Sequence, residues 1–118
     1  MIVHLTSDLL LASRVGTAAD DAGLPIQTAL TVAQAIAATT REVVTGLLID
    51  LETGGLELAE LFRQLPDRAQ LCVVAYGPHV HAQLLEAATS AGCELVLTRG
   101  QLDRNVREVL ARLAREVS

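Results

Sequence analysis

Val43-Val44-Thr45-Gly46-Leu47-Leu48-Ile49-Asp50-Leu51-Glu52-Thr53-Gly54-Gly55 is the stretch of sequence that decides the fold. An apolar run leads to one carboxylate, passes a second and ends at paired glycines. Because residues 43–49 show no polar alternation, we expect a strand that is covered on both faces, as in a parallel sheet between helices. Such sheets place ligand and reaction sites at their carboxyl edge. Asp50 is therefore the first candidate functional residue.

The composition indicates one globular domain over residues 1–118, since 51% of the residues are hydrophobic. The net charge is −5, and the nine basic residues are all arginine, which excludes Schiff-base chemistry and lysine-dependent phosphate loops. An acidic chain with two aromatic residues, Phe62 and Tyr76, is a poor nucleic-acid binder. Its apolar runs are too short to cross a membrane and its start has no basic leader. We expect a cytoplasmic protein.

Five apolar segments alternate with segments that have helical spacing or helix-capping residues. The expected strands are 2–6, 26–30, 43–49, 71–75 and 94–98. Four of the expected helices begin at Asp8 behind a Ser7 cap, at Val32 behind a Thr31 cap, at Leu56 and at Gln101, the last running to about Glu116. The fourth helix along the chain has Pro78 in its first turn. Such alternation requires right-handed crossovers and a parallel sheet. We predict a doubly wound, flavodoxin-like α/β fold with strand order 2-1-3-4-5.

In that order, four loops meet at the carboxyl edge of the sheet and hold all the candidate chemistry. They are Thr6-Ser7-Asp8, Asp50-Leu51-Glu52, Ala75-Tyr76-Gly77 and Thr98-Arg99. We expect the Asp50 carboxyl group to be exposed at this rim, with the Arg99 guanidinium within reach. His4, in the middle of the first strand, is expected to be a hydrogen-bonded, buried or half-buried side chain. Cys72 and Cys93 are expected to be buried thiols, and neither a disulfide nor a zinc site.

The chain resembles the receiver domain (CheY-like) of two-component response regulators. Leu48–Glu52, Val74–Gly77, Ala91-Gly92 and Leu97–Arg99 carry the resemblance, which covers the whole length and leaves no residues for an output domain. It implies a stand-alone signalling domain, not an enzyme. In that family the aspartate at the position of Asp50 accepts a phosphoryl group from a histidine kinase. An acidic pair binds Mg²⁺, a Ser or Thr senses the phosphate, and a Lys pairs with it.

The match to that pattern is partial. The acidic pair falls on Leu5-Thr6 or Thr6-Ser7, which hold no carboxylate, and only Asp8 is close. The Ser/Thr position falls on Ala75, Tyr76 or Gly77, and the Lys position on Arg99. The resemblance thus implies at most a weak Mg²⁺ site and a modified phosphate pocket. The metal residues would be Asp8, Asp50 and Glu52, and the pocket residues Thr6, Ser7, Tyr76, Thr98 and Arg99.

Structural roles for the same residues stay open. Asp50 could be a strand-end carboxylate paired with Arg99, and Asp8 a helix cap. His79 and His81 point to different faces of a helix start, which argues against a shared metal. The arginines of the last helix could form a solvated face, or part of the face of fourth helix, fifth strand and fifth helix that receivers use for dimers and partners. Those arginines are Arg104, Arg107, Arg112 and Arg115.

Two functions follow from these alternatives. The first is a receiver with Asp50 as phosphoacceptor and a histidine kinase or signalling protein as partner. The second is a phosphorylation-independent pseudo-receiver that binds a protein partner constitutively. A small-molecule site or enzyme at the same edge is disfavoured, because no Gly-rich phosphate loop follows the first strand and no nucleophile, base and orienting residue converge there.

Overall fold

The computed structural model describes residues 1–115. Strands and helices alternate along the chain, as the sequence predicts, with one short 3₁₀ helix added before the fourth strand. The elements are β1 (Ile2–Leu5), α1 (Leu9–Asp21), β2 (Ile26–Ala29), α2 (Val32–Arg41), β3 (Gly46–Asp50), α3 (Leu58–Gln64), η1 (Arg68–Gln70), β4 (Cys72–Gly77), α4 (Ala82–Ser90), β5 (Leu95–Thr98), α5 (Arg99–Arg104) and α6 (Val106–Ala114).

The five strands form one parallel sheet in the order β2-β1-β3-β4-β5. The predicted doubly wound, flavodoxin-like fold is therefore confirmed. β3 lies in the centre, with β1 and β4 as its neighbours, and its last residue, Asp50, is level with Tyr76 of β4. Consequently the chain after each strand emerges at one edge of the sheet, where the four predicted loops do meet.

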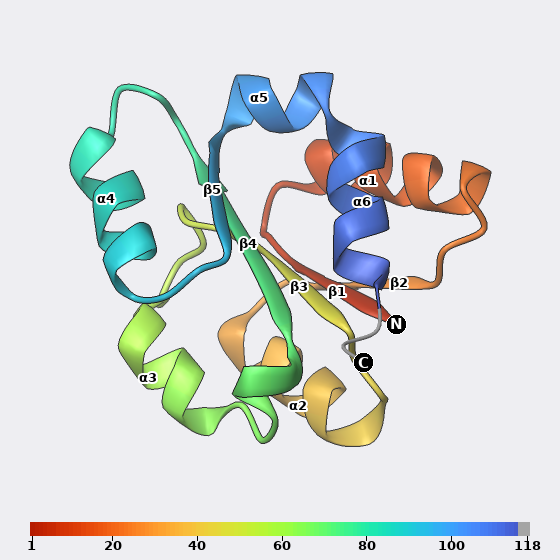
Figure 1. Cartoon of the computed structure of the whole chain (residues 1–118), viewed down its shortest axis with the longest axis horizontal. Coiled ribbons are helices and arrows are strands. Elements are labelled where there is room, and N and C mark those ends of the chain that lie inside the picture. Colours follow the sequence, from red (N-terminus) through yellow and green to blue (C-terminus); the bar gives the residue numbers. More distant parts are fainter. Residues whose placement is uncertain (116–118) are drawn as a thin grey trace.

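Helices cover both faces of the sheet (Figure 1). α2, α3 and α4 bury one apolar cluster, whose strand residues include Val3, Leu5, Leu47, Ile49 and Val73. The cluster on the other face lies under α1, α5 and α6, and its strand residues include Ile2, Leu48, Val74 and Tyr76. Because successive strand residues point to opposite faces, odd-numbered residues of these central strands serve the first cluster and even-numbered ones the second.

The predicted start of the third strand is wrong. β3 begins at Gly46, and Val43 lies outside the sheet with 86% of its surface exposed. The sheet begins at this level because β1 begins at Ile2, which is level with Gly46. Thr45 extends the pairing by one residue on both sides: its amide donates to the Met1 carbonyl at 2.9 Å, and its carbonyl accepts the Cys72 amide at 3.0 Å.

The predicted single terminal helix, residues 101–116, is also wrong, because it breaks at Asn105 into α5 and α6. The Asn105 side-chain amide donates to the Gln101 carbonyl at 2.8 Å, and its backbone amide reaches the same carbonyl. An asparagine side chain that competes for backbone groups in this way ends a helix. The Asn105 carbonyl then accepts from Val109 and opens α6. The predicted end at Glu116 lies outside the described residues.

α6 packs unusually closely on the centre of the sheet. A Cβ atom added to Gly46 would lie 2.4 Å from the Leu113 carbonyl oxygen and 2.6 Å from the Leu113 Cβ. Only glycine permits this approach of helix backbone to strand. The contact is anchored beside it by the Thr45 hydroxyl, which donates to the Leu113 carbonyl at 2.9 Å.

Two smaller observations complete the fold. Cys72 and Cys93 are free thiols, as expected, but both are half-buried, so the prediction of full burial is wrong. Burial raises the pKa of both thiols, that of Cys93 to about 11, which keeps them protonated at neutral pH. Within residues 1–115, no helix has the length and apolar character needed to cross a membrane.

Candidate functional site

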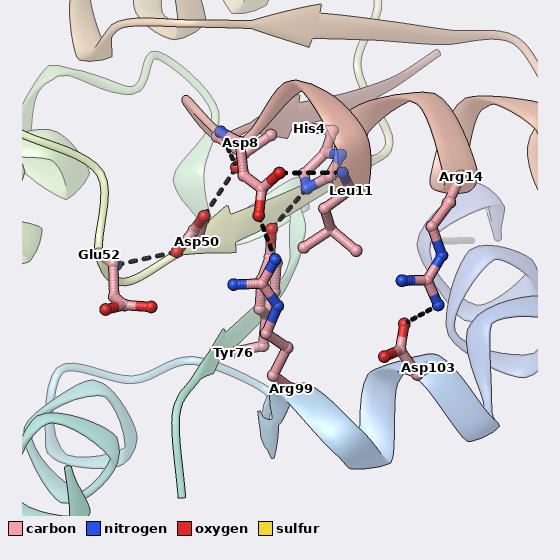
Figure 2. Close-up of polar contacts among 10 residues, drawn as sticks. His4, Asp8, Leu11, Arg14, Asp50, Glu52, Tyr76, Arg99 and Asp103 are labelled. Carbon is pink, nitrogen blue, oxygen red and sulfur yellow. Dashed lines mark hydrogen bonds and ion pairs between the residues drawn. The ribbon is translucent and has the colours of Figure 1, made fainter. Parts of the chain in front are cut away.

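Asp50 lies at the carboxyl end of β3. The prediction that its carboxyl group is exposed is wrong, because only 4% of the surface of Asp50 is accessible. Both carboxylate oxygens accept hydrogen bonds from the chain itself. The Thr6 hydroxyl donates to Oδ2 at 2.7 Å, and the Glu52 backbone amide donates to Oδ1 at 2.9 Å (Figure 2). The second bond forms because an aspartate side chain readily reaches the amide two residues on. The carboxylate is therefore buried and satisfied by its own loop and by β1.

Thr6 links this carboxylate to the first helix. It is fully buried, and its hydroxyl accepts the backbone amide of Asp8 at 3.0 Å while it donates to Asp50. The predicted Ser7 cap is wrong, because Asp8 is the N-cap of α1 and accepts the Leu11 amide at 3.1 Å. Asp8 caps better than Ser7 here because a charged oxygen at a helix N-terminus also benefits from the helix dipole.

Arg99 forms an ion pair with Asp8 and not with Asp50. The guanidinium Nη2 donates to Asp8 Oδ2, and 41% of the arginine side chain and 29% of the aspartate side chain are exposed. The Leu11 amide and Arg99 hold the pKa of the Asp8 carboxyl group below its usual value. The hydrogen bond to Asp8, together with the charges of Asp8 and Asp50, raises the pKa of Arg99. Arg99 thus pairs with Asp8, the N-cap residue of α1, and the Asp50–Arg99 pair considered above does not form.

A buried pair of ring side chains lies beneath these charges. His4 Nε2 and the Tyr76 hydroxyl are 2.7 Å apart, and both residues are 1% exposed or less. Burial lowers the pKa of His4 to about 4, although the nearby charges of Asp50 and Asp8 oppose the shift. Burial also raises the pKa of Tyr76, and the charge of Asp50 adds to that effect. Both rings are therefore neutral at pH 7. The predicted hydrogen-bonded, buried His4 is confirmed.

The remaining predicted site residues do not join this group. Glu52 contributes its backbone amide to Asp50, while Ser7 and Glu52 are exposed. Thr98 is the N-cap of α5, where it forms a reciprocal capping box with Gln101. Tyr76 occupies the end of β4 but points inward to His4. The structure thus brings together Thr6, Asp8, Asp50, Tyr76 and Arg99, and leaves Ser7, Glu52 and Thr98 at its margin.

These residues do not fit a Mg²⁺ ion as they are arranged. Mg²⁺ requires an octahedral set of oxygen ligands and binds proteins through carboxylates that are free to face it. Here all four carboxylate oxygens of Asp8 and Asp50 accept hydrogen bonds from protein donors. Between Met1 and Arg115, no group of three or more His, Cys, Asp or Glu residues could hold a metal ion. The structure gives no support to the predicted weak Mg²⁺ site.

Sequence reasoning missed the role of His4 in this site. A signal was available in the parity of the first strand, because Ile2, His4 and Thr6 share one face. The same face of β3 ends in Asp50 and that of β4 in Tyr76. A polar residue on that face in each of three adjacent strands predicts one buried polar cluster.

Comparison with known proteins agrees with this fold. No family model matches the sequence, and no curated protein matches it either. Among solved structures, the chain is similar to the receiver domain of NtrX from Brucella abortus, with a TM-score of 0.81 and 19% identity over 97% of this chain and 98% of that one. The chemotaxis response regulator CheY4 of Vibrio cholerae gives a TM-score of 0.73 and 12% identity over 95% and 96%.

A third similar structure is a response regulator protein from Burkholderia pseudomallei with a phosphorylated aspartic acid, a calcium ion and citrate. Its TM-score is 0.70 at 15% identity, over 94% of this chain and 71% of that one. At these identities the likeness establishes the fold alone. The chain has the fold of a response-regulator receiver domain, as the sequence motifs predict.

Proposed function

We propose that the chain is a receiver-type signalling module that acts by binding a protein partner, and that its state does not depend on Mg²⁺-assisted phosphorylation of Asp50. The buried, fully hydrogen-bonded carboxylate of Asp50 carries this proposal. A phosphoacceptor must present an oxygen to the donor, and a metal must offset the repulsion between the anionic groups. The oxygens of Asp50 face Thr6 and the Glu52 amide instead.

The partner surface that we favour is the side formed by β5, α5 and α6. β5 is an edge strand whose residues are all half-buried, and α5 packs against it. Four arginines are exposed on α5, on α6 and directly after α6: Arg104, Arg107, Arg112 and Arg115. A cluster of arginines on an otherwise acidic protein suits a partner with an acidic surface. A dimer of this chain through the face of α4, β5 and the terminal helical segment, which α5 and α6 now form, is the competing arrangement.

The test is exposure of the purified protein to phosphodonors. We expect no mass increase after incubation with acetyl phosphate and Mg²⁺, and no amide chemical-shift change with beryllofluoride and Mg²⁺. As a matched gain-of-function control, the double variant Thr6→Asp/Ser7→Asp restores carboxylates at the acidic-pair positions. A response in the double variant and none in the wild type would show that the residues at positions 6 and 7 are the reason, through the missing carboxylates and the Thr6 hydrogen bond that closes Asp50. A stoichiometric mass increase in the wild type that Asp50→Asn abolishes would contradict the proposal.

That contradicting outcome would establish the second candidate function, a receiver with Asp50 as phosphoacceptor. One observation favours it: Asp50 ends the central strand at the edge where the β1, β4 and β5 loops meet, with a cation within electrostatic range. The solved response regulator with a phosphorylated aspartic acid has the same fold. In this case a histidine kinase would be the partner, and the Thr6 hydroxyl would have to release Asp50 Oδ2 before phosphorylation.

A further inference from the structure

Two ion pairs connect the start of the chain to the segment after β5. Arg99 reaches Asp8 at the head of α1, and Arg14, farther along α1, lies 2.8 Å from Asp103 of α5. Figure 2 shows the two pairs side by side, each between α1 and α5. The Arg14–Asp103 pair is largely exposed, and such pairs contribute little. Arg99 is different, because it is also close enough to Asp50 for that charge to raise its pKa.

Arg99 is a positive charge at an edge of the sheet that holds two carboxylates. Asp8 and Asp50 bring two negative charges to one region, and Thr6 and backbone amides supply dipoles but no charge. Arg99 is bound directly to Asp8, and the charge of Asp50 adds to the rise in the pKa of Arg99. A guanidinium stays protonated at any physiological pH and holds a carboxylate with directed hydrogen bonds. One of the two negative charges at this edge is therefore balanced by a side chain that begins α5, directly after β5.

We propose that Arg99 is the resident counter-ion of Asp8 and Asp50: its guanidinium provides one positive charge where a divalent cation would provide two, and it occupies the Asp8 oxygen that such a cation would need, and so excludes a metal ion from this edge. The inference deepens the proposed function and rests on it, since a pocket that contains its own cation holds one state without metal or phosphoryl group. It also gives the β5–α5 connection a fixed attachment to α1. The mismatch between this site and Mg²⁺ is then a consequence of one side chain as well as of the missing carboxylates.

The experiment removes the charge of Arg99 and asks whether Mg²⁺ takes its place. Arg99→Gln keeps a hydrogen-bond donor of similar reach, Arg99→Lys keeps the charge, and Arg104→Gln removes an exposed arginine that takes part in no ion pair within residues 1–115. Each protein is titrated to about 20 mM Mg²⁺ while its melting temperature is measured. The emission of Tyr76, the only tyrosine in a chain without tryptophan, provides a second readout next to the site.

We expect Mg²⁺ to raise the melting temperature of Arg99→Gln by about 4 °C, and to leave the wild type, Arg99→Lys and Arg104→Gln within about 1 °C of their metal-free values. The double variant Asp8→Asn/Arg99→Gln should lose the response, because it leaves no unpaired Asp8 carboxylate. If Arg99→Gln does not fold without metal, folding restored by Mg²⁺ supports the proposal. A protein that stays unfolded at every Mg²⁺ concentration overturns it.

The remaining outcomes separate this inference from the function on which it rests. If Arg99→Gln folds and its melting temperature does not change with Mg²⁺, the proposal that Arg99 excludes a metal ion is wrong. The proposal that Asp50 of the wild type is closed to phosphorylation is not affected by that result. Saturable Mg²⁺ binding by the wild type overturns the inference. The proposed function fails separately, when the wild type gains mass from acetyl phosphate.

Discussion

The two faces of the sheet are built from the same strands, yet they bury different chemistry. Toward α2, α3 and α4 the central strands present Val3, Leu5, Leu47, Ile49 and Val73, all apolar. Toward α1, α5 and α6 the face is apolar at its amino end and polar at its carboxyl end, where His4, Thr6, Asp50 and Tyr76 lie. One face therefore only holds the fold together, whereas the other holds it and also positions the candidate site.

This difference shows where stability and function can be separated. On the apolar face, any side chain of the right volume serves. On the polar face, each group depends on its neighbour: the histidine needs the tyrosine hydroxyl, and the aspartate needs the threonine hydroxyl. Substitutions on the second face should thus show strong coupling between hydrogen-bonded partners.

The largest effect is expected on the apolar face. Leu47→Ala removes a fully buried side chain from the centre of the sheet and should lower the free energy of unfolding by about 2–5 kcal/mol. Urea unfolding followed by circular dichroism measures the loss. Leu9→Ala, at a position with 67% of its surface exposed, is the control and should change stability by less than about 0.5 kcal/mol. Equal losses in the two variants would mean that the apolar face does not carry the fold.

The next effect concerns pH and belongs to the polar face. The pKa of His4 is about 4 in the folded protein and 6.5 ordinarily, so the unfolded chain binds the proton first as the pH falls. The contribution of neutral His4 to the free energy of unfolding is present in full above about pH 6.5 and is lost as the pH falls toward 4. It amounts to about 3 kcal/mol in total. Urea midpoints measured from pH 7 to pH 4 give the curve. His4→Phe should flatten it, and an unchanged slope in that variant would remove His4 as the cause.

A smaller effect should reveal the pairing on the polar face. Tyr76→Phe leaves His4 Nε2 without a partner in a buried site and should cost about 1–3 kcal/mol. The double variant His4→Phe/Tyr76→Phe removes both polar groups. Its loss of unfolding free energy should therefore be smaller than the sum of the losses in the two single variants. A double-mutant cycle of unfolding free energies measures this coupling. Strict additivity would show that the two rings are independent, and would end the contrast between the faces.

The smallest effect tests a residue that lies beside the polar face without belonging to it. Thr98→Ala removes the capping box of α5 and should cost about 1 kcal/mol in unfolding free energy. Thr98→Ser keeps the capping hydroxyl and should match the wild type. The emission of Tyr76 should be the same in all three proteins. A change in that emission would indicate that Thr98 is part of the pocket, as the resemblance to receiver domains implies.

The sequence predicted the fold well because the fold depends on long apolar runs and on glycine and proline positions that few other architectures tolerate. Strand order and the meeting of four loops followed from the alternation alone. Element ends were harder to predict, since Asn105 ends a helix through a side-chain hydrogen bond to Gln101 that no periodicity reveals. The start of β3 depends on where its neighbour β1 begins, which is a property of the sheet and not of residues 43–45.

The site was predicted less well, for a physical reason. Loops that meet at one edge bring several charged groups within reach of each other, and the pairs that form depend on small differences in position. Arg99 could reach either acid, and it pairs with Asp8 because Thr6 and the Glu52 amide already hold Asp50. Five of the predicted residues do lie together at this edge (Thr6, Asp8, Asp50, Tyr76 and Arg99), but Arg99 has a different partner from the one considered, and the roles of all five stay predictions. His4 was expected in the core, but its connection to Tyr76 was not foreseen.

The contact between Gly46 and Leu113 has a consequence for how the chain reaches its native state during synthesis. The central strand is made early, but the helix that seals one side of it comes from the end of the described chain. Until that helix has left the ribosome, Leu48 and its even-numbered neighbours are covered only by α1 and α5, so a nascent chain that lacks α6 must keep part of this apolar surface open. Completion of this domain is therefore a late event, and chaperones have the longest time to act on that one side.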